Sequence, residues 1–197
     1  MCIRDRVIDV IKSAEHEGKM TVRLHTGDPS LYGAIREQMD RLDELGIKYD
    51  ICPGVSSFCG AAAALRAEYT LPDVSQTVII TRMAGRTPVP EKESIAALAA
   101  HNATMVIFLS TGFLKELSAE LIRGGYKPDT PAAIVYKASW ADQKVCRCTV
   151  EDLAQTASDN GITKTALICV GYFLGNDYSL SKLYDKSFET EFRKAEI

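Results

Sequence analysis

Hydrophobic positions in the first third of the chain follow two different spacings. Residues 21–25 and 48–52 place apolar side chains at every second position, as a strand does. Helical spacing occurs over residues 7–17, 31–45 and the alanine run 61–64. We expect the first helix to end at Gly18, because glycine is the usual residue just beyond a helix. Strands that alternate with helices predict a mostly parallel sheet covered by helices, which is an α/β fold.

The second half keeps the α/β pattern but changes the expected sheet. Strand-like runs occur at residues 77–81, 104–109, 132–136, 144–149 and 165–172. Helical segments occur at residues 91–100, 113–123 and 150–158. The third and fourth strands are joined by a loop short enough for antiparallel pairing, so a mixed sheet is predicted.

A domain boundary is expected near Leu71-Pro72-Asp73. The predicted organisation is an N-terminal α/β domain over residues 1–74 and a C-terminal mixed-sheet α/β domain over residues 75–197. The C-terminal domain ends in a polar tail that begins at Asn176 and has no clear periodicity beyond a possible short helix.

Charge and hydropathy exclude two classes of partner. The net charge is −3 with mixed signs, so no basic surface for nucleic acid is expected, which also argues against a methyltransferase of ribosomal RNA. Apolar runs such as residues 105–109 and 166–170 are too short to cross a bilayer, so no membrane segment is expected.

The six cysteines form no C-x-x-C pair, and most of them stand in apolar runs. This usage indicates buried free thiols in a reducing compartment, and we expect a cytoplasmic protein. The three histidines are scattered along the chain without metal-ligand spacing, so no protein-bound metal is expected.

Three loops follow predicted strands, at residues 25–32, 53–57 and 82–90. In parallel α/β folds, ligands bind at this end of the strands, where loops present backbone groups. The first two loops are rich in glycine, proline and small hydroxyl residues, which allow a ligand to approach the main chain. The Gly-Asp-Pro turn alone is weak support, since Asp and Pro are also common where a helix begins.

Taken together, the loops resemble a known family. The run HTGDPSLYG at residues 25–33, followed by PGVSS at residues 53–57, is similar to the paired loops of the tetrapyrrole methylases, which use S-adenosylmethionine. Within that superfamily, TRMAGRTPVPE at residues 81–91 resembles the enzymes that methylate carbon 11 of precorrin-4 in corrin synthesis. The tail after residue 173 looks more like members that act after cobalt insertion.

The resemblance implies two α/β domains with the cofactor in a cleft between them, in a homodimer. The implied cofactor-binding residues are Thr26, Gly27, Asp28, Leu31, Ser56, Ser57, Leu109, Ala138 and Ala166. Helix capping is the alternative role for Asp28, Ser56 and Ser57, and core packing is the alternative for Leu109 and Ala166.

The implied substrate is a tetrapyrrole that carries acetate and propionate carboxylates, which calls for guanidinium and ammonium groups. We expect Arg82, Arg86 and Lys137 to bind it, with solvated surface charge as the alternative. The ring supplies its own nucleophilic carbon, so neither a metal nor an enzymic nucleophile is needed. Candidates for accepting a proton are Asp28, Tyr32 and Glu91.

One departure from the family is expected to matter. Members begin with a strand that ends in a G-x-G-P-G-D loop, and residues 1–6 do not match it. The N-terminal domain is therefore expected to be incomplete. A noncatalytic or inactive protein that binds the cofactor or a corrinoid, and another member of the superfamily, are the alternative interpretations.

Overall fold

The computed structural model describes residues 3–189, 191–192 and 194. The chain forms two compact units, which divide between Cys59 and Gly60. Helix α3 (Ser57–Leu65) spans this division, and the hydrogen bond of 3.0 Å from Arg147 to the carbonyl of Leu65 lies within the second unit. The domain boundary after residue 74 stays a prediction.

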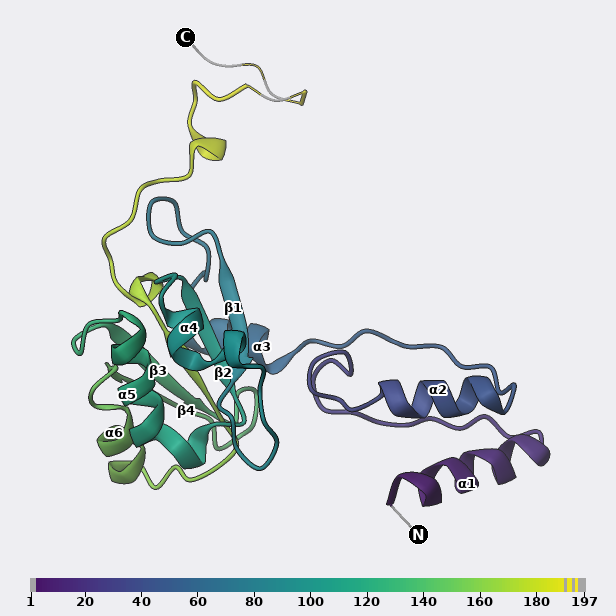
Figure 1. Ribbon diagram of the computed structural model, residues 1–197. Coiled ribbons are helices and arrows are strands. Elements are labelled where there is room, and N and C mark those ends of the chain that lie inside the picture. The colour runs from purple at the N-terminus through teal and green to yellow at the C-terminus, as the bar shows by residue number, and fades with distance from the viewer. Residues whose placement is uncertain (1–2, 190, 193, 195–197) are drawn as a thin grey trace. The chain divides into compact units, whose positions relative to one another are not determined.

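The first unit contains two helices that lie side by side, α1 (Ile3–His16) and α2 (Arg36–Glu44) (Figure 1). The expected end of the first helix at Gly18 is confirmed. Gly18 has a φ of +66°, and the N–H of the next residue donates to the carbonyl of Ala14 at 2.9 Å. This is the hydrogen bond that terminates many helices at a glycine.

The strands expected at residues 21–25 and 48–52 are wrong. Both segments lack regular secondary structure, and residues 20–25 and 48–52 make no backbone-to-backbone hydrogen bond. A strand exists through its ladder to a neighbour, and these segments have none. Their alternating apolar side chains are exposed as a result, with Val22 71%, Leu24 87% and Ile51 48% exposed.

The second helix also begins later than predicted, at Arg36 instead of residue 31. The chain turns back on itself first, with Tyr32 at φ +57° and Ala34 at φ +51°, both incompatible with a right-handed helix. Gly33 makes this turn possible, because a Cβ there would overlap the carbonyl of Pro29.

The second unit is built on a five-stranded sheet in the order β1-β2-β5-β3-β4. The strands are β1 (Val78–Arg82), β2 (Thr104–Phe108), β3 (Pro131–Tyr136), β4 (Lys144–Thr149) and β5 (Ala166–Val170). β1 and β2 are parallel, whereas the other neighbours are antiparallel. The mixed sheet and the antiparallel pairing of β3 with β4 are therefore confirmed.

Three helices cover one face of the sheet (Figure 1): α4 (Ile95–Ala99), α5 (Leu114–Gly124) and α6 (Leu153–Asp159). Their apolar side chains form the core with alternate residues of the strands, among them Leu117, Leu121, Met105, Ile134 and Ile168. Burying each such side chain contributes about 1.5–3 kcal/mol.

The helix expected over residues 91–100 is divided in two. A 3-10 turn, η1 (Glu91–Glu93), precedes α4, and Ser94 lies between them with extended backbone. The Ser94 hydroxyl accepts a hydrogen bond from the N–H of Ala97, so Ser94 caps α4. The remaining 3-10 turns are η2 (Thr111–Phe113), η3 (Tyr172–Leu174) and η4 (Lys182–Tyr184).

The central strands β2, β5 and β3 are also buried on the other face of the sheet. Tyr69 packs edge-on against Phe173, with ring centroids 5.1 Å apart, and its hydroxyl lies 3.7 Å from the sulfur of Cys169 on β5. Within the described residues, no helix has the length and apolar character needed to span a bilayer.

Candidate functional site

The two loops of the first unit are held together by Asp28 and by close backbone contact. One carboxylate oxygen of Asp28 accepts hydrogen bonds from the N–H and hydroxyl of Ser30, which closes the turn. The other accepts a hydrogen bond of 2.9 Å from the N–H of Gly54 in the second loop. A Cβ on Gly54 would overlap the carbonyl oxygen of Gly27, so the second loop needs glycine at this position.

These hydrogen bonds also set the protonation of Asp28. The Ser30 hydroxyl, followed by the N–H groups of Gly54 and Ser30, lowers the pKa of the carboxyl below its usual range, against a smaller effect of desolvation. A carboxylate held in its ionised form by three donors is a poor proton acceptor. The geometry therefore favours a role for Asp28 in joining the loops over that of a general base.

The other candidate residues of the first unit lie on these two loops. Thr26, Ser57 and Tyr32 are exposed, Leu31 is half-buried and Ser56 is buried. Gly27 has a φ of +69°, and a Cβ there would lie 3.5 Å from the backbone of Ser56 and Ser57. Thr26, Gly27 and Ser57 thus lie where the two loops meet.

The candidate residues of the second unit gather at one end of the sheet. β1, β2 and β3 end there, and β5 begins there. Ala166 is paired with Tyr136, and Ile168 with Ile107, which places Leu109 in the same row as Ala166. Ala138 follows two residues after Tyr136. Leu109, Ala138 and Ala166, which are far apart in the sequence, therefore share one edge.

Backbone strain is concentrated at this end of the sheet. Leu109, Lys137, Ser139 and Thr165 all have positive φ, from +45° to +71°. Such a conformation costs about 1–3 kcal/mol for each non-glycine residue and tends to occur at functional sites. The sequence does not predict these positive φ values, because leucine and lysine do not favour this conformation.

Leu109 is the most unusual of these residues. It directly follows β2, whose residues are all buried, yet its side chain is 69% exposed. Core packing, the alternative role for Leu109, is therefore wrong. Ala166 is half-buried, and its carbonyl accepts a hydrogen bond of 3.2 Å from the hydroxyl of Thr111.

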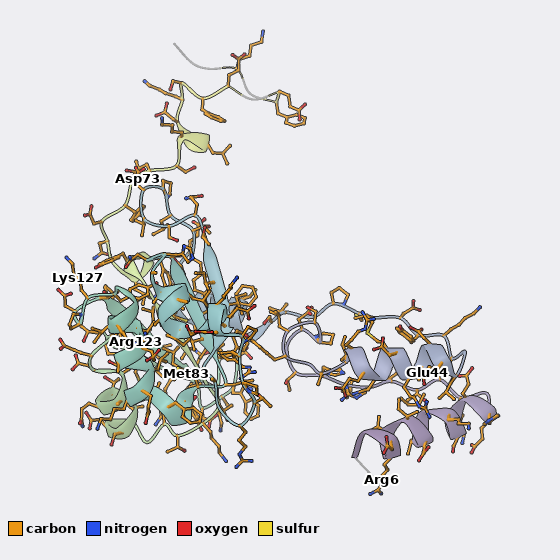
Figure 2. All side chains as sticks on the ribbon, viewed as in Figure 1. Arg6, Glu44, Asp73, Met83, Arg123 and Lys127 are labelled. Carbon is orange, nitrogen blue, oxygen red and sulfur yellow. The ribbon has the colours of Figure 1, made fainter. Side chains whose placement is uncertain are left out.

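Arg82 braces the loop that follows β1. Its guanidinium donates to the carbonyls of Met83 and Thr87 at 3.1 Å and to that of Pro88 at 2.9 Å. Met83, which begins the loop, is labelled in Figure 2. The remaining N–H donors of Arg82 are still available, so the side chain can hold the loop and pair with one carboxylate as well.

The other charged candidates differ in how far they are engaged. Arg86, at the tip of the loop, is exposed and makes no hydrogen bond or ion pair with any residue that the structure describes. Lys137 is paired with Asp142, whose hydrogen bond raises the pKa of the lysine, and its Nζ lies 5.1 Å from the ring centroids of Tyr136 and Trp140. Glu91 is exposed at the start of η1.

Of the three cationic candidates Arg82, Arg86 and Lys137, Arg86 is therefore the one most available to a ligand. In the described part of the chain, no three His, Cys, Asp or Glu side chains come together as they would around a metal ion.

Residues 4–154 match the model of a family described as Tetrapyrrole (Corrin/Porphyrin) Methylases. The cobalt-precorrin-4 C(11)-methyltransferase of Methanocaldococcus jannaschii is 55% identical, over 97% of this chain and 74% of that protein. The enzyme of the same name from Priestia megaterium is 48% identical, over 96% of this chain and 75% of that protein. A crystal structure of a cobalt precorrin-4 methyltransferase is 48% identical with a TM-score of 0.85, over 87% of this chain and 72% of that one.

Proposed function

Because this chain belongs to the tetrapyrrole methylase family, a family of methyltransferases that use S-adenosylmethionine, we propose that it methylates carbon 11 of cobalt-precorrin-4 in cobalamin synthesis. The observation that carries the proposal is the 55% identity with an enzyme of that name over 97% of the chain. Precorrin-4 without cobalt is the second candidate substrate, since the Mycobacterium tuberculosis enzyme named for it is 46% identical over 85% of the chain.

The residues present fit S-adenosylmethionine in both units. Leu109 offers an exposed apolar side chain, and Ala138 and Ala166 leave room beside it, as an adenosyl group requires. In the first unit, Thr26 and Ser57 are exposed hydroxyl residues next to the glycine contact that joins the loops. We assign the methyl donor to these residues together with Gly27, Asp28, Leu31 and Ser56.

When bound, S-adenosylmethionine would supply a methyl group attached to a positively charged sulfur. The sulfur would leave as the ring carbon takes the methyl group. The work left to the protein is to align the two reactants and exclude water. Asp28 acts by fixing the loop pair. Tyr32 and Glu91 are the remaining candidates for receiving a proton from the ring, and both are exposed to a ligand.

The tetrapyrrole is bound through its carboxylates. Arg86 has no competing partner among the described residues, and a guanidinium suits a planar carboxylate better than an ammonium does. Arg82 shapes the loop that presents Arg86 and contributes its remaining donors. Lys137 has the smaller role in our proposal, because Asp142 must release it first.

Three features of organisation belong to the proposal as well. The N-terminal α/β domain ends near residue 74, the protein acts as a homodimer, and it works in the cytoplasm. Sedimentation equilibrium of the purified chain tests the dimer. A sedimenting mass equal to that of the single chain would contradict it.

The function itself is tested by incubating the purified chain with S-adenosylmethionine and cobalt-precorrin-4. A product heavier by one methyl group, with nuclear magnetic resonance locating it on carbon 11, is the expected result. Parallel reactions with precorrin-4 and with uroporphyrinogen test the substrate. Faster turnover of uroporphyrinogen would assign the chain to another branch of the family. If the folded chain turns over none of these substrates, the alternative of a noncatalytic binding protein is favoured.

A further inference from the structure

Ser110 is a buried polar residue two positions beyond the end of β2. It is 0% exposed. Its hydroxyl donates to the carbonyl of Phe108 at 2.7 Å and accepts a hydrogen bond of 2.8 Å from the N–H of Met83. The hydroxyl thus donates one hydrogen bond and accepts one, and both partners are backbone groups at strand ends.

The usual role of a serine at this position does not apply. Ser110 precedes the 3-10 turn η2, where a serine hydroxyl commonly caps the first N–H groups, yet here it makes no such bond. The hydroxyl is turned back toward the strand instead. Its hydrogen bond starts one residue after Leu109 and ends one residue before it, so the bond closes a small ring around Leu109.

Leu109 needs such a restraint. Its φ of +53° brings its Cβ against the backbone, and its exposed side chain gains nothing from burial. Strained residues persist only where their surroundings fix them. Among the described residues, the Ser110 hydroxyl is the side-chain group whose hydrogen bond spans this position.

The same hydroxyl connects two elements of the site. Met83 is the first residue of the loop that carries Arg86, and β1 and β2 are parallel neighbours with Arg82 opposite Phe108. One buried group therefore fixes both the residue assigned to the methyl donor and the origin of the loop assigned to the tetrapyrrole.

We infer that Ser110 is a positioning residue of the ligand site, which holds Leu109 in its strained conformation with the side chain exposed and anchors the loop after β1 at Met83. The inference rests on the proposed function, because Leu109 serves a ligand only if the methyl donor binds at this end of the sheet. Ser110 itself touches no reactant.

The test is a double-mutant cycle on Leu109 and Ser110, with the demethylated cofactor, S-adenosylhomocysteine, as the probe in calorimetry. Ser110→Ala should weaken binding about tenfold. Leu109→Gly removes both the strain and the side chain that is held in place. In the Leu109→Gly background, Ser110→Ala should therefore change affinity by less than about twofold. Equal losses in both backgrounds would overturn the inference.

Two further proteins keep the outcome clear. Ser118→Ala removes another buried serine hydroxyl, on α5, and should leave the affinity for S-adenosylhomocysteine unchanged. If Ser110→Ala does not fold, Ser110→Cys, with a weaker donor of similar size, takes its place in the cycle. If the wild-type chain is folded but binds no S-adenosylhomocysteine, this result contradicts both the proposed function and this inference. Wild-type binding that Ser110→Ala leaves intact overturns the inference alone.

Discussion

Asp28 and Gly54 are 26 residues apart in the sequence, and a hydrogen bond of 2.9 Å joins the carboxylate of the first to the N–H of the second. Next to this bond, the backbone of Gly54 touches the carbonyl of Gly27 too closely for any side chain. The polar bond and the glycine contact together make the two loops of the first unit one structural element, so that a change in either loop is transmitted to the other.

Gly54→Ala should disturb both loops. The added methyl group would overlap the Gly27 carbonyl, and relieving the overlap costs about 1–3 kcal/mol or separates the loops. We expect at least about tenfold weaker binding of S-adenosylhomocysteine in calorimetry. Gly112→Ala is the matched control, because a methyl group there meets no atom within 4 Å. Similar losses in both variants would mean that the loop contact is unimportant for the ligand.

Asp28 should make stability depend on pH only in acid. Its pKa is lowered in the folded chain from the ordinary 3.8 by the Ser30 hydroxyl and the N–H groups of Gly54 and Ser30. Its contribution to stability is therefore complete above the unfolded pKa and is lost as the pH falls through the lower folded pKa. Urea unfolding of wild type and Asp28→Asn should show a difference that is constant from about pH 5 to 8 and shrinks below about pH 4. A difference that changes near pH 7 would contradict the assigned hydrogen bonds.

Arg86→Ala should affect the tetrapyrrole and spare the methyl donor. Loss of a charge-assisted hydrogen bond to a carboxylate is expected to raise the dissociation constant of an octacarboxylate tetrapyrrole about tenfold to a hundredfold. Lys92→Ala, which removes an exposed cation of η1, is the charge-matched control and should have little effect. If the two variants lose affinity equally, only the general charge of this surface matters.

Arg82 should behave differently from Arg86, since it also braces the loop. Arg82→Lys keeps the charge but has one nitrogen in place of two, whereas the guanidinium reaches Met83 and Thr87 from one nitrogen and Pro88 from the other. We expect Arg82→Lys to lower tetrapyrrole affinity nearly as much as Arg82→Ala does, in the same titration. Full rescue by lysine would show that charge alone is required there.

The cysteines should differ widely in reactivity toward iodoacetamide. Burial raises the pKa of Cys169 to about 12 and that of Cys148 to about 11, which suppresses their thiolates. Cys52 and Cys59 are exposed in the folded chain. Mass spectrometry after brief labelling at pH 8 should find the label on Cys52 and Cys59 before Cys148 and Cys169. Early labelling of Cys169 would mean that the sheet opens readily.

The sequence was most informative where burial decides the structure. All residues of β2 are buried, and the continuous apolar run at 105–108 identified this strand to within one residue. The strand predicted at residues 21–25 was wrong because these residues are not buried against a partner. Their alternation shows which face a strand would bury, but it carries no information on whether a partner is present to accept the backbone hydrogen bonds.

The candidate site also has features that the sequence predicts and features that it does not. Motif resemblance located the loops at residues 25–33 and 53–57, and the structure brings them together through Asp28 and Gly54. The use of Arg82 within its own loop could not be foreseen, because it depends on where the carbonyls of residues 83–88 point. The role of Ser110 was hidden as well, since a serine before a helical turn usually indicates a cap.

β2 is covered on both faces and is paired on both edges, with β1 on one side and β5 on the other (Figure 1). Amide protons in such a strand exchange with solvent only when the whole unit opens. The slowest-exchanging amides of the chain should therefore be those of Val106 and Ile107, a few residues before Leu109. The edge of the sheet that Leu109 shares with Ala138 and Ala166 is attached to this strand. We therefore expect this edge to keep its shape for as long as the second unit stays folded, even when the surrounding loops move.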